Sequence, residues 1–497
     1  MKRIISFLKT DIKIINSYFL FTTILIILVC IGYSSYALFS FTKTSTNIIE
    51  ATVGKLKNNI DTSGANSPVL ASNMIPVYYD ETNSVWRKAD SSNTNETYKW
   101  YDYDNKMWAN AVTVTETNRS TYLSANAGTE ININDINTMW VWIPRYTYTY
   151  LNTNTPQEIG IKFENGTEST GTIKCTDNVS GSGTTSQTCT DATNGSLKAG
   201  TSTYTHPAFT FGDKELTGLW VGKFESSATT LPTSESTAES TVIIKPNVQS
   251  LRYKAVSYQF RDARQMEKAN NAYGFPQSSS TTFNWNGNLT GDTNNIDIHM
   301  MKNTEWGAVT YLSHSKYGIN KEIAINSQNT YTTGCGPQSS GSTSSGSTCN
   351  AYNTELGQTS STTGNVYGVY DMSGGSFEYT MGNVVNSSNQ FYTSSASNWS
   401  TTSTPLAKYY DSYTYNDSST TYTRGRLGDA TVEMAPTGNR GNWYSDYARF
   451  LKSSYSWFRR GGVYGYGTDA GAFYFDLNNG NAFGNYSFRV SLGAQAS

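Results

Sequence analysis

Four cysteines are placed so that they could form two local disulfides. Cys175 and Cys189 enclose TDNVSGSGTTSQT, and Cys335 and Cys349 enclose GPQSSGSTSSGST, so both pairs have the same spacing. Loops of Ser, Gly and Thr have high chain entropy, and closing about 15 residues contributes on the order of 3 kcal/mol. The alternative, a metal site, needs four thiolates converging from distant loops without a CxxC knuckle. The spacing therefore favours two disulfides, which persist outside the cytoplasm.

The last stretch of the chain carries side chains suited to ligand recognition. It reads WFRRGGVYGYGTDAGAFYFDLNNGNAFGNYSFRVSL (457 to 492) and contains neither Cys nor His. Tyr gives rigid contact area with few rotatable bonds and Asn adapts its hydrogen bonds, a composition typical of antibody paratopes. Because apolar Phe473, Phe475 and Leu477 alternate with these residues, we expect one outward face; the alternatives are a core hairpin or a surface without a selected partner. The predicted ligand-binding residues are Tyr464, Tyr466, Asp469, Tyr474, Asp476, Asn478, Asn479, Asn481, Phe483 and Tyr486.

Catalytic constellations are not evident in the sequence. The three histidines, His206, His299 and His314, include no pair four residues apart. We expect His299 and His314 to be surface groups or hydrogen-bonded core groups. No G-x-S-x-G element frames a nucleophilic serine. Glycoside hydrolysis needs two carboxylates across a cleft, and no spacing selects a pair among the acidic residues of the C-terminal half. The sequence therefore predicts a protein that is not an enzyme.

The N-terminal segment sets the compartment. Basic residues in 1–17 precede the apolar run 18–41, and no further charge occurs until Lys43. About 20 apolar residues span a bilayer as a helix, and the basic flank stays in the cytoplasm. We therefore expect a single-pass cell-membrane protein whose remainder is extracytoplasmic. A cleaved signal peptide is the alternative, because Ser35–Tyr36–Ala37 resembles a small-x-small site.

The remaining chain divides by pattern into a stalk and two folded regions. Residues 42–67 are polar and predict a stalk, and 68–130 show short alternating strands typical of a small β module. From 138 to 497 aromatic strands alternate with long Ser/Thr/Asn/Gly loops. Helical periodicity occurs at 257–275 and 303–318, with Gly274 and Gly318 as stop signals. The expected fold class is α+β.

Composition excludes one class of partner. With 36 Lys and Arg against 38 Asp and Glu, the formal net charge is -2, so the basic clustering of a nucleic-acid binder is missing. Charged residues make up 15% and aromatic residues 13%, which predicts a folded chain with a neutral, polar surface. We expect an extracellular protein or glycan ligand.

Three segments, in order, resemble one family. GNVYGVYDMSGGSFEYTMGN (364 to 383), the helix NTEWGAVTYLSHS, and RGGVYGYG followed by YSFRVSL resemble formylglycine-generating-enzyme-like domains (sulfatase-modifying-factor type), a branch of the C-type lectin fold. The resemblance implies a loop-rich lectin-like domain over 138–497. Gly375 to Tyr379 departs from the family's G-N-V-W-E-W but keeps aromatic, Glu and aromatic in register. The residues expected to be structural are Arg460, Gly461, Gly462, Glu378 and Arg489, with Glu378 as the buried partner of one arginine.

The catalytic residues of that family's two enzyme branches are missing from this sequence. The copper-dependent branch uses two cysteines between the R-G-G and G-F-R segments, and this chain has no Cys after Cys349. The iron-dependent branch uses an H-x-x-x-H-x-E triad, which is missing as well. No cofactor is expected, although a structural Ca²⁺ bound by carboxylate and carbonyl oxygens is compatible with this fold.

The ending is similar to the variable region of proteins diversified by retroelements. In such regions Asn codons change readily to Tyr, Asp, Ser, Phe, Gly or Ala codons, which matches the residues at 464–486. The resemblance implies a surface display protein. The alternatives are an adhesin or glycan-binding protein of fixed specificity and an unrecognised enzyme of the same fold. Segments 441–457 and TGLWVGKFES around Trp220 are expected to flank the same surface.

Overall fold

The computed structural model describes residues 61–497, with gaps at 180–184, at 277–295 apart from Asn284 and Gly287, at 387–403 apart from Phe391, Ser397 and Trp399, and at 415, 438–440 and 495–497. The expected cytoplasmic segment 1–17 and membrane anchor 18–41 lie outside the described residues. Among the helices of the described residues, none has both the length and the apolar character needed to cross a bilayer. Residues Ile60–Ser497 form one compact unit.

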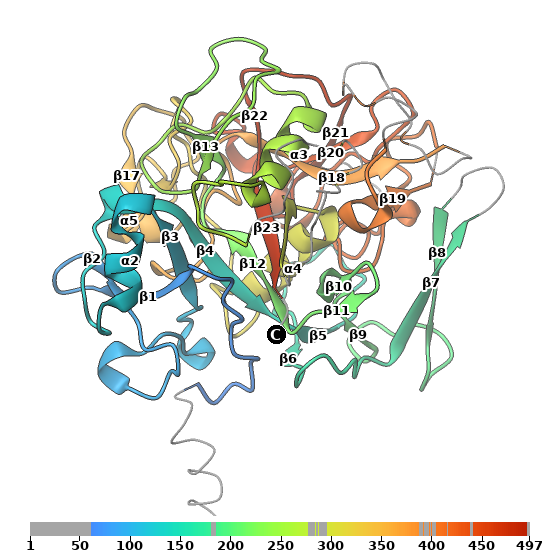
Figure 1. Ribbon diagram of the computed structural model, residues 1–497. Coiled ribbons are helices and arrows are strands. Elements are labelled where there is room, and N and C mark those ends of the chain that lie inside the picture. Colours follow the sequence, from blue (N-terminus) through green and yellow to red (C-terminus); the bar gives the residue numbers. More distant parts are fainter. Residues whose placement is uncertain are drawn as a thin grey trace, which may run out of the picture. The chain divides into compact units, whose positions relative to one another are not determined.

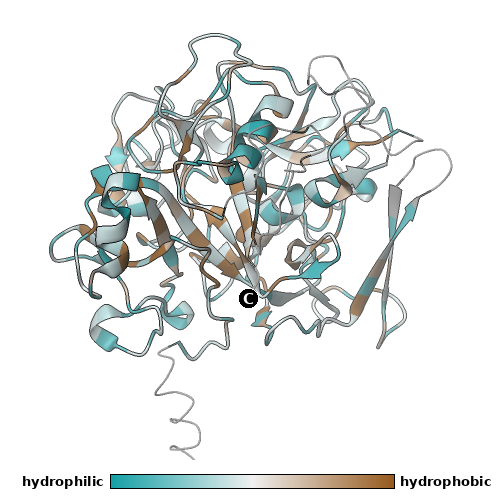
Figure 2. Cartoon of the chain, viewed as in Figure 1, coloured by the Kyte–Doolittle hydropathy of each residue, from teal (hydrophilic) through white to brown (hydrophobic). Residues whose placement is uncertain are grey.

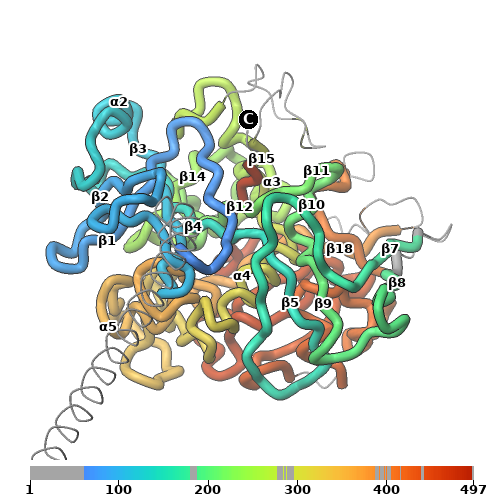
Figure 3. The backbone as a smooth tube through the Cα atoms, turned by 90° about the horizontal axis from the view of Figure 1, so that it is seen from below, coloured from blue at the N-terminus to red at the C-terminus, as the bar shows by residue number. Residues whose placement is uncertain are grey.

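A seven-stranded antiparallel sheet forms the centre of this unit (Figure 1). Its order is β15-β23-β12-β4-β3-β1-β2. The strands are β1 (Ile75–Asp80), β2 (Val85–Lys88), β3 (Asn110–Val114), β4 (Ile136–Pro144), β12 (Gly218–Gly222), β15 (Ile296–Met300) and β23 (Val490–Ala494). Figure 3 shows the C-terminal end of the chain beside β15, in agreement with the pairing of β23 and β15.

The expected boundary between a small β module and a second domain is wrong. Strand β3, inside 68–130, pairs with β4, and Asn110 and Ala111 lie opposite Val141 and Trp140. The two segments therefore share one sheet and one hydrophobic core. Short strands joined by polar turns look self-contained in a sequence, because the pattern does not reveal a partner beyond the intervening helix α2 (Glu116–Ser124).

The expected stalk also ends earlier than predicted. Asn66 donates from Nδ2 to the carbonyls of Gly166 and Thr217, both at 2.9 Å. The carboxylate of Asp61 accepts a hydrogen bond from the backbone N–H of Tyr103 at 2.7 Å. Residues 61–67 are thus part of the folded unit, and their polar composition reflects hydrogen bonding to its surface.

A second, five-stranded sheet holds the C-terminal segment. Strand β18 pairs in parallel with β19 and β22 and antiparallel with β20, which in turn pairs with β21. The strands are β18 (Phe377–Val384), β19 (Asp411–Tyr413), β20 (Trp457–Arg460), β21 (Phe475–Asn478) and β22 (Tyr486–Phe488). Only Arg489 separates β22, in this sheet, from β23, in the seven-stranded sheet. That residue is therefore the joint between the two sheets.

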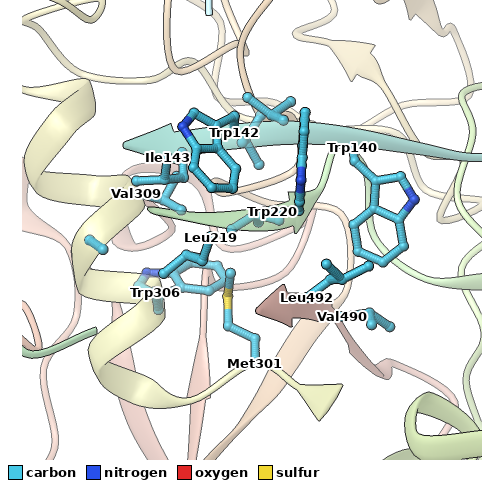
Figure 4. Close-up of a cluster of buried hydrophobic side chains, with 14 of the residues drawn as sticks. Trp140, Trp142, Ile143, Leu219, Trp220, Met301, Trp306, Val309, Val490 and Leu492 are labelled. Atoms are coloured by element: carbon cyan, nitrogen blue, oxygen red, sulfur yellow. The ribbon is translucent and has the colours of Figure 1, made fainter. Parts of the chain in front are cut away.

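The hydrophobic core lies between the seven-stranded sheet and helix α4 (Asn303–Ser313). Figure 4 shows Trp306 and Val309 of α4 directed toward Leu219 and Trp142 of the sheet. Trp140, Trp142, Trp220 and Trp306 are all fully buried. Hydrophobic residues concentrate on the strands in Figure 2, whereas the connecting loops are mostly teal to white. This distribution explains how a chain with such polar loops forms a large core.

The two predicted helices are present but shorter than their patterns. Helix α3 spans Val256–Arg264 and continues as one 3-10 turn to Glu267, and Phe260, Ala263 and Met266 are buried on the predicted stripe. Helix α4 begins as expected at Asn303, where Glu305 accepts a hydrogen bond from the N–H of Lys302 at 2.8 Å. It ends at Ser313, before the predicted stop at Gly318.

Both predicted disulfides are confirmed. Cys175 is bonded to Cys189 across a hairpin of β7 (Ile173–Val179) and β8 (Thr185–Asp191), in which the two cysteines lie opposite each other. Cys335 is bonded to Cys349 beside the short pair β16 (Cys335–Gly336) and β17 (Asn350–Ala351). Figures 1 and 3 both place β7 and β8 at the periphery, next to β9. The remaining elements are β5 (Tyr146–Thr149), β6 (Ile161–Phe163), β9 (Thr203–Thr205), β10 (Thr210–Phe211), β11 (Lys214–Glu215), β13 (Ser227–Ala228), β14 (Val242–Ile243) and α5 (Glu355–Gln358).

Candidate ligand-binding surface near the C-terminal end

The ten predicted ligand-binding residues separate into a surface set and a buried set. Tyr466 and Phe483 are 42% and 57% exposed, and Asp469 is exposed as well. The surface set, called the display surface below, consists of Tyr464, Tyr466, Asp469, Asn479, Asn481 and Phe483, all exposed or half-buried. It lies on two loops, one between β20 and β21 and one between β21 and β22.

The other four predicted residues do not face solvent, contrary to expectation. Tyr474, Asp476, Asn478 and Tyr486 are each at most 9% exposed. The alternation of apolar and polar residues predicts a solvated face only where one side of a strand is open. Here both sides of β21 are covered, so its polar side chains face other polar groups instead of water.

These four residues form a hydrogen-bonded buried network with arginine. Arg459 lies directly opposite Asp476 in the β20–β21 ladder, and its Nε donates to Asp476 Oδ2 at 3.0 Å. Arg459 Nη1 and Asn478 Nδ2 both donate to the Tyr486 hydroxyl oxygen, at 3.1 and 3.0 Å. Tyr474 donates to Asp476 Oδ2 at 3.1 Å. Burial raises the pKa of Tyr474 well above its usual value, so its hydroxyl stays protonated as a donor.

The network extends toward the surface through aromatic contacts. The guanidinium of Arg459 lies 4.1 Å from the centre of the Phe377 ring, and Phe377 contacts Tyr466 edge-on at 5.1 Å between ring centres. Phe483 contacts Tyr486 at 5.6 Å. The exposed rings therefore rest on buried partners that are fixed by hydrogen bonds, which restricts their motion.

Two glycines set the path of the chain beneath the surface. Gly461 and Gly462 follow β20 with φ of 79° and 75°, a left-handed conformation that side chains rarely adopt. A Cβ atom on Gly462 would lie 2.6 Å from the Cβ of Ala470. This close approach holds the start of the first display loop against its end.

Three residues that the sequence analysis did not select complete the surface. Arg252 lies over the ring of Tyr331 at 4.1 Å, and Tyr331 contacts Tyr464 edge-on at 5.0 Å. The N–H of Tyr253 donates to the carbonyl of Phe483 at 3.0 Å. Tyr253 and Tyr331 have φ of 62° and 60°, unusual for tyrosine. Their positions depend on tertiary contacts, so no local pattern could have identified them.

Of the two segments expected to flank the display surface, only one lies beside it. In 441–457, the N–H of Tyr447 donates to the carbonyl of Asp469 at 2.9 Å, so this segment does adjoin the display surface. Trp220 does not: it lies in the centre of the seven-stranded sheet and is fully buried. Strand β12 has neighbours on both sides in the sheet, which the short motif could not indicate.

A recess of about 420 Å³ lies next to the first display loop. Gly467 and Ala470 of that loop line it together with Tyr444, residues Lys321–Ile325 and the disulfide-closed loop at Ser340–Thr343. A recess beside exposed tyrosines gives the surface a place for a projecting group of a ligand.

The three histidines and two acidic residues of the C-terminal half, Asp371 and Glu378, are buried in the fold. Burial lowers the pKa of His206 to about 3 and that of His314 to about 4, so both are neutral core residues. His299 Nε2 lies 2.9 Å from Glu305 Oε1 inside the fold. Asp371 and Glu378 are 1% and 0% exposed and belong to the core instead of a cleft.

The expected buried pair between Glu378 and an arginine is present, and the arginine is Arg489. Arg489 donates from Nη2 to Glu378 Oε1 at 2.6 Å and from Nε to Oε2 at 3.1 Å. It also donates to the carbonyl of Gly222 in β12 at 2.8 Å and to that of Tyr370 at 2.9 Å. Arg460 instead donates to the carbonyls of Asp429 and Ala430. One guanidinium thus connects both sheets.

One group of carboxylates in the described part of the chain has the spacing of a cation site. Asp61, Asp102 and Asp104 place one oxygen each within 4.8 Å of one another. Burial raises the pKa of Asp61 to about 6. None of the three residues belongs to the display surface or lines the recess beside it.

The chain matches no family model and no curated protein in sequence.

The hydroxyl of Tyr486 provides a direct test of the buried network. Tyr486→Phe leaves the donors of Arg459 and Asn478 without their shared acceptor inside the fold, so we expect the free energy of unfolding to fall by about 1–3 kcal/mol. Tyr466→Phe, at a position 42% exposed, is the matched control and should change it by less than about 0.5 kcal/mol. Urea denaturation followed by tryptophan fluorescence measures both. Equal effects of the two substitutions would contradict the network.

Proposed function

We propose that this chain is a non-catalytic cell-surface protein that binds a ligand through a diversified C-terminal surface. The domain would belong to the formylglycine-generating-enzyme-like branch of the C-type lectin fold, held at the membrane by residues 18–41. The two disulfides support an extracellular location, since such bonds persist in oxidising compartments. The ligand would be a protein or a glycan outside the cell.

One observation carries the proposal: exposed aromatic and half-buried amide side chains lie on loops that rest on a buried hydrogen-bonded network. Tyr466 and Phe483 are exposed, whereas Arg459 and Asp476 beneath them are paired between adjacent strands. Rigid aromatic side chains lose little conformational entropy on binding, and neighbouring amides provide adaptable hydrogen bonds. A surface of this kind tolerates substitution because the fold depends on the residues below it.

Comparison of the gene among closely related isolates tests the diversification. Codons for the six residues of the display surface should vary, whereas codons for Arg459, Gly461, Gly462 and Arg489 should not. A near-copy template and a reverse transcriptase gene should lie nearby. Uniform codons at the six positions and no template would refute diversification.

A fixed-specificity adhesin is the second candidate, favoured by the recess beside Tyr444 and Gly467. In that case one ligand class should bind on a glycan or protein array. For either function, Tyr466→Ala combined with Phe483→Ala should weaken binding at least tenfold, because central aromatic residues dominate interface energies. The double variant should keep the unfolding free energy of the parent within about 1 kcal/mol, since both side chains are exposed. Unchanged binding by this variant would show that the ligand uses another surface.

A further inference from the structure

A second concave site lies beneath the disulfide hairpin, separate from the display surface. It is a cleft of about 660 Å³ between hairpin β7–β8 and the body of the fold. Its lining includes Lys174 and Asp177 of β7, Tyr204 of β9, Lys302 at the start of α4, and Tyr410. No residue of the display surface lines it.

The wall of this cleft is fixed to the body. Arg426 donates to both carboxylate oxygens of Asp177, at 2.8 and 2.7 Å. The N–H of Leu427 donates to Gln187 Oε1 of β8 at 3.1 Å. Together with the Cys175–Cys189 bond, these contacts hold the hairpin in place, so one wall of the cleft is fixed to the body of the fold.

Most charged groups that line the cleft already have partners. Glu215 pairs with Arg145 at 2.7 Å and Lys408 pairs with Asp297 at 2.6 Å. Asp411 accepts a hydrogen bond from the N–H of Thr304, in the first turn of α4, at 2.7 Å. The carboxylates of Glu215 and Asp411 are therefore held by donors of the protein itself.

Among the buried charged residues of the lining, Lys302 is the exception. The residue is 5% exposed and lines the cleft, yet its ammonium has no hydrogen-bond or carboxylate partner among the described residues. Its closest aromatic contact is the ring of Phe211, whose centre lies 5.2 Å away, and the ammonium of Lys408 lies 5.3 Å from the same centre. The Lys302 side chain lies near the carboxyl of Glu305 but makes no direct ion pair with it among the described residues. An oxyanion of a ligand that enters the cleft can therefore form a direct, charge-assisted hydrogen bond with this ammonium.

The geometry points to a binding site for an acidic saccharide, whose carboxylate or sulfate group pairs with Lys302. The hydroxyls of Ser169, Thr205, Thr210 and Thr304 line the same cleft and suit the hydroxyl groups of a sugar. The rings of Tyr204 and Tyr410 offer apolar faces to the sugar ring. The volume falls within the range of small-molecule sites. This site does not depend on the display surface, so either one can fail alone.

Titration calorimetry of the purified protein at low salt tests the site with four probes. These are a sulfated heparin-derived hexasaccharide, a hyaluronan hexasaccharide carrying carboxylates, neutral cellohexaose, and inorganic sulfate alone. We expect one or both acidic saccharides to bind, with affinity falling as salt rises, and cellohexaose to bind at least tenfold more weakly. Comparison of the two acidic probes with inorganic sulfate identifies which oxyanion is recognised and whether the sugar contributes. Equal binding of cellohexaose, or no binding of either acidic saccharide, would overturn the inference.

Two lysine variants separate recognition from folding. Lys302→Met should reduce affinity for the bound saccharide at least tenfold, because a charge-assisted hydrogen bond is lost. The same variant should change the melting temperature little, because the ammonium makes no direct hydrogen bond or ion pair among the described residues and the backbone N–H of residue 302 still donates to Glu305. Lys198→Met, at an exposed position outside the cleft, is the matched control and should bind as the parent does. A lower melting temperature for Lys302→Met, or unchanged affinity, would assign the lysine a structural role and refute the site.

Discussion

Replacing Arg489 with methionine is expected to lower the free energy of unfolding by about 3–5 kcal/mol. Among the described residues, Arg489 alone bonds Glu378 through a guanidinium, and the substitution removes it while the carboxyl group stays buried. It also frees the carbonyls of Gly222 and Tyr370 from their donor. The loss should therefore exceed that of an ordinary surface substitution by several-fold, as measured by urea denaturation at pH 7.

Two further variants define the origin of this effect. Arg87→Met breaks an equally short but partly exposed pair with Asp80, at 2.7 Å, and should cost at most about 1 kcal/mol. Combining Arg489→Met with Glu378→Met replaces both buried partners by apolar groups and should recover part of the loss. A single Arg489→Met variant as stable as the Arg87→Met variant would show that the buried pair is not important to the fold.

The second large effect is a dependence of stability on pH that originates at Glu433. This carboxyl group is 2% exposed and accepts hydrogen bonds from the hydroxyls of Tyr148 and Tyr311 at 2.8 and 2.7 Å. Burial raises its pKa from 4.5 to about 7 in the folded protein. The folded state therefore binds the proton more tightly than the unfolded state does. Its contribution to stability is complete below about pH 4.5 and is lost as pH rises to about 7.

Glu433→Gln isolates this contribution. The parent's unfolding free energy minus that of the variant should fall by about 3 kcal/mol between pH 4.5 and 7.5. Buried His206 and His314, with lowered pKa values, act in the opposite sense, but they are common to both proteins and cancel in the difference. Glu355→Gln, at an exposed helix position, is the control. A difference that stays constant with pH would exclude Glu433 as the source.

The features that the sequence predicted correctly depend on contacts close in the chain or on strongly constrained residue types. Each disulfide joins cysteines 14 positions apart, and the start of α4 follows from local capping. Glu378 could be expected to find an arginine, because a buried carboxylate needs a partner. Which arginine it would be, Arg489 instead of Arg459 or Arg460, depends on how the two sheets meet.

The features that could not be predicted depend on pairing between distant strands. The sequence pattern predicts that the polar residues of β21 form one solvated face. In the structure both faces of the strand are covered, so Asp476 and Asn478 are buried. Strands β3 and β4 read as parts of different domains because their partnership crosses an intervening helix. Arg252 and Tyr331 reach the display surface from loops that carry no local signal of it.

The position of β23 has a consequence for biosynthesis. This strand follows the display loops in the chain, yet it occupies an interior place in the large sheet, between β15 and β12. While a ribosome is still translating the loops, those two neighbours have no strand between them. A premature stop or a shift of reading frame within the loops would remove β23 and leave the core open. We therefore expect a folded product only when the reading frame stays intact through both display loops.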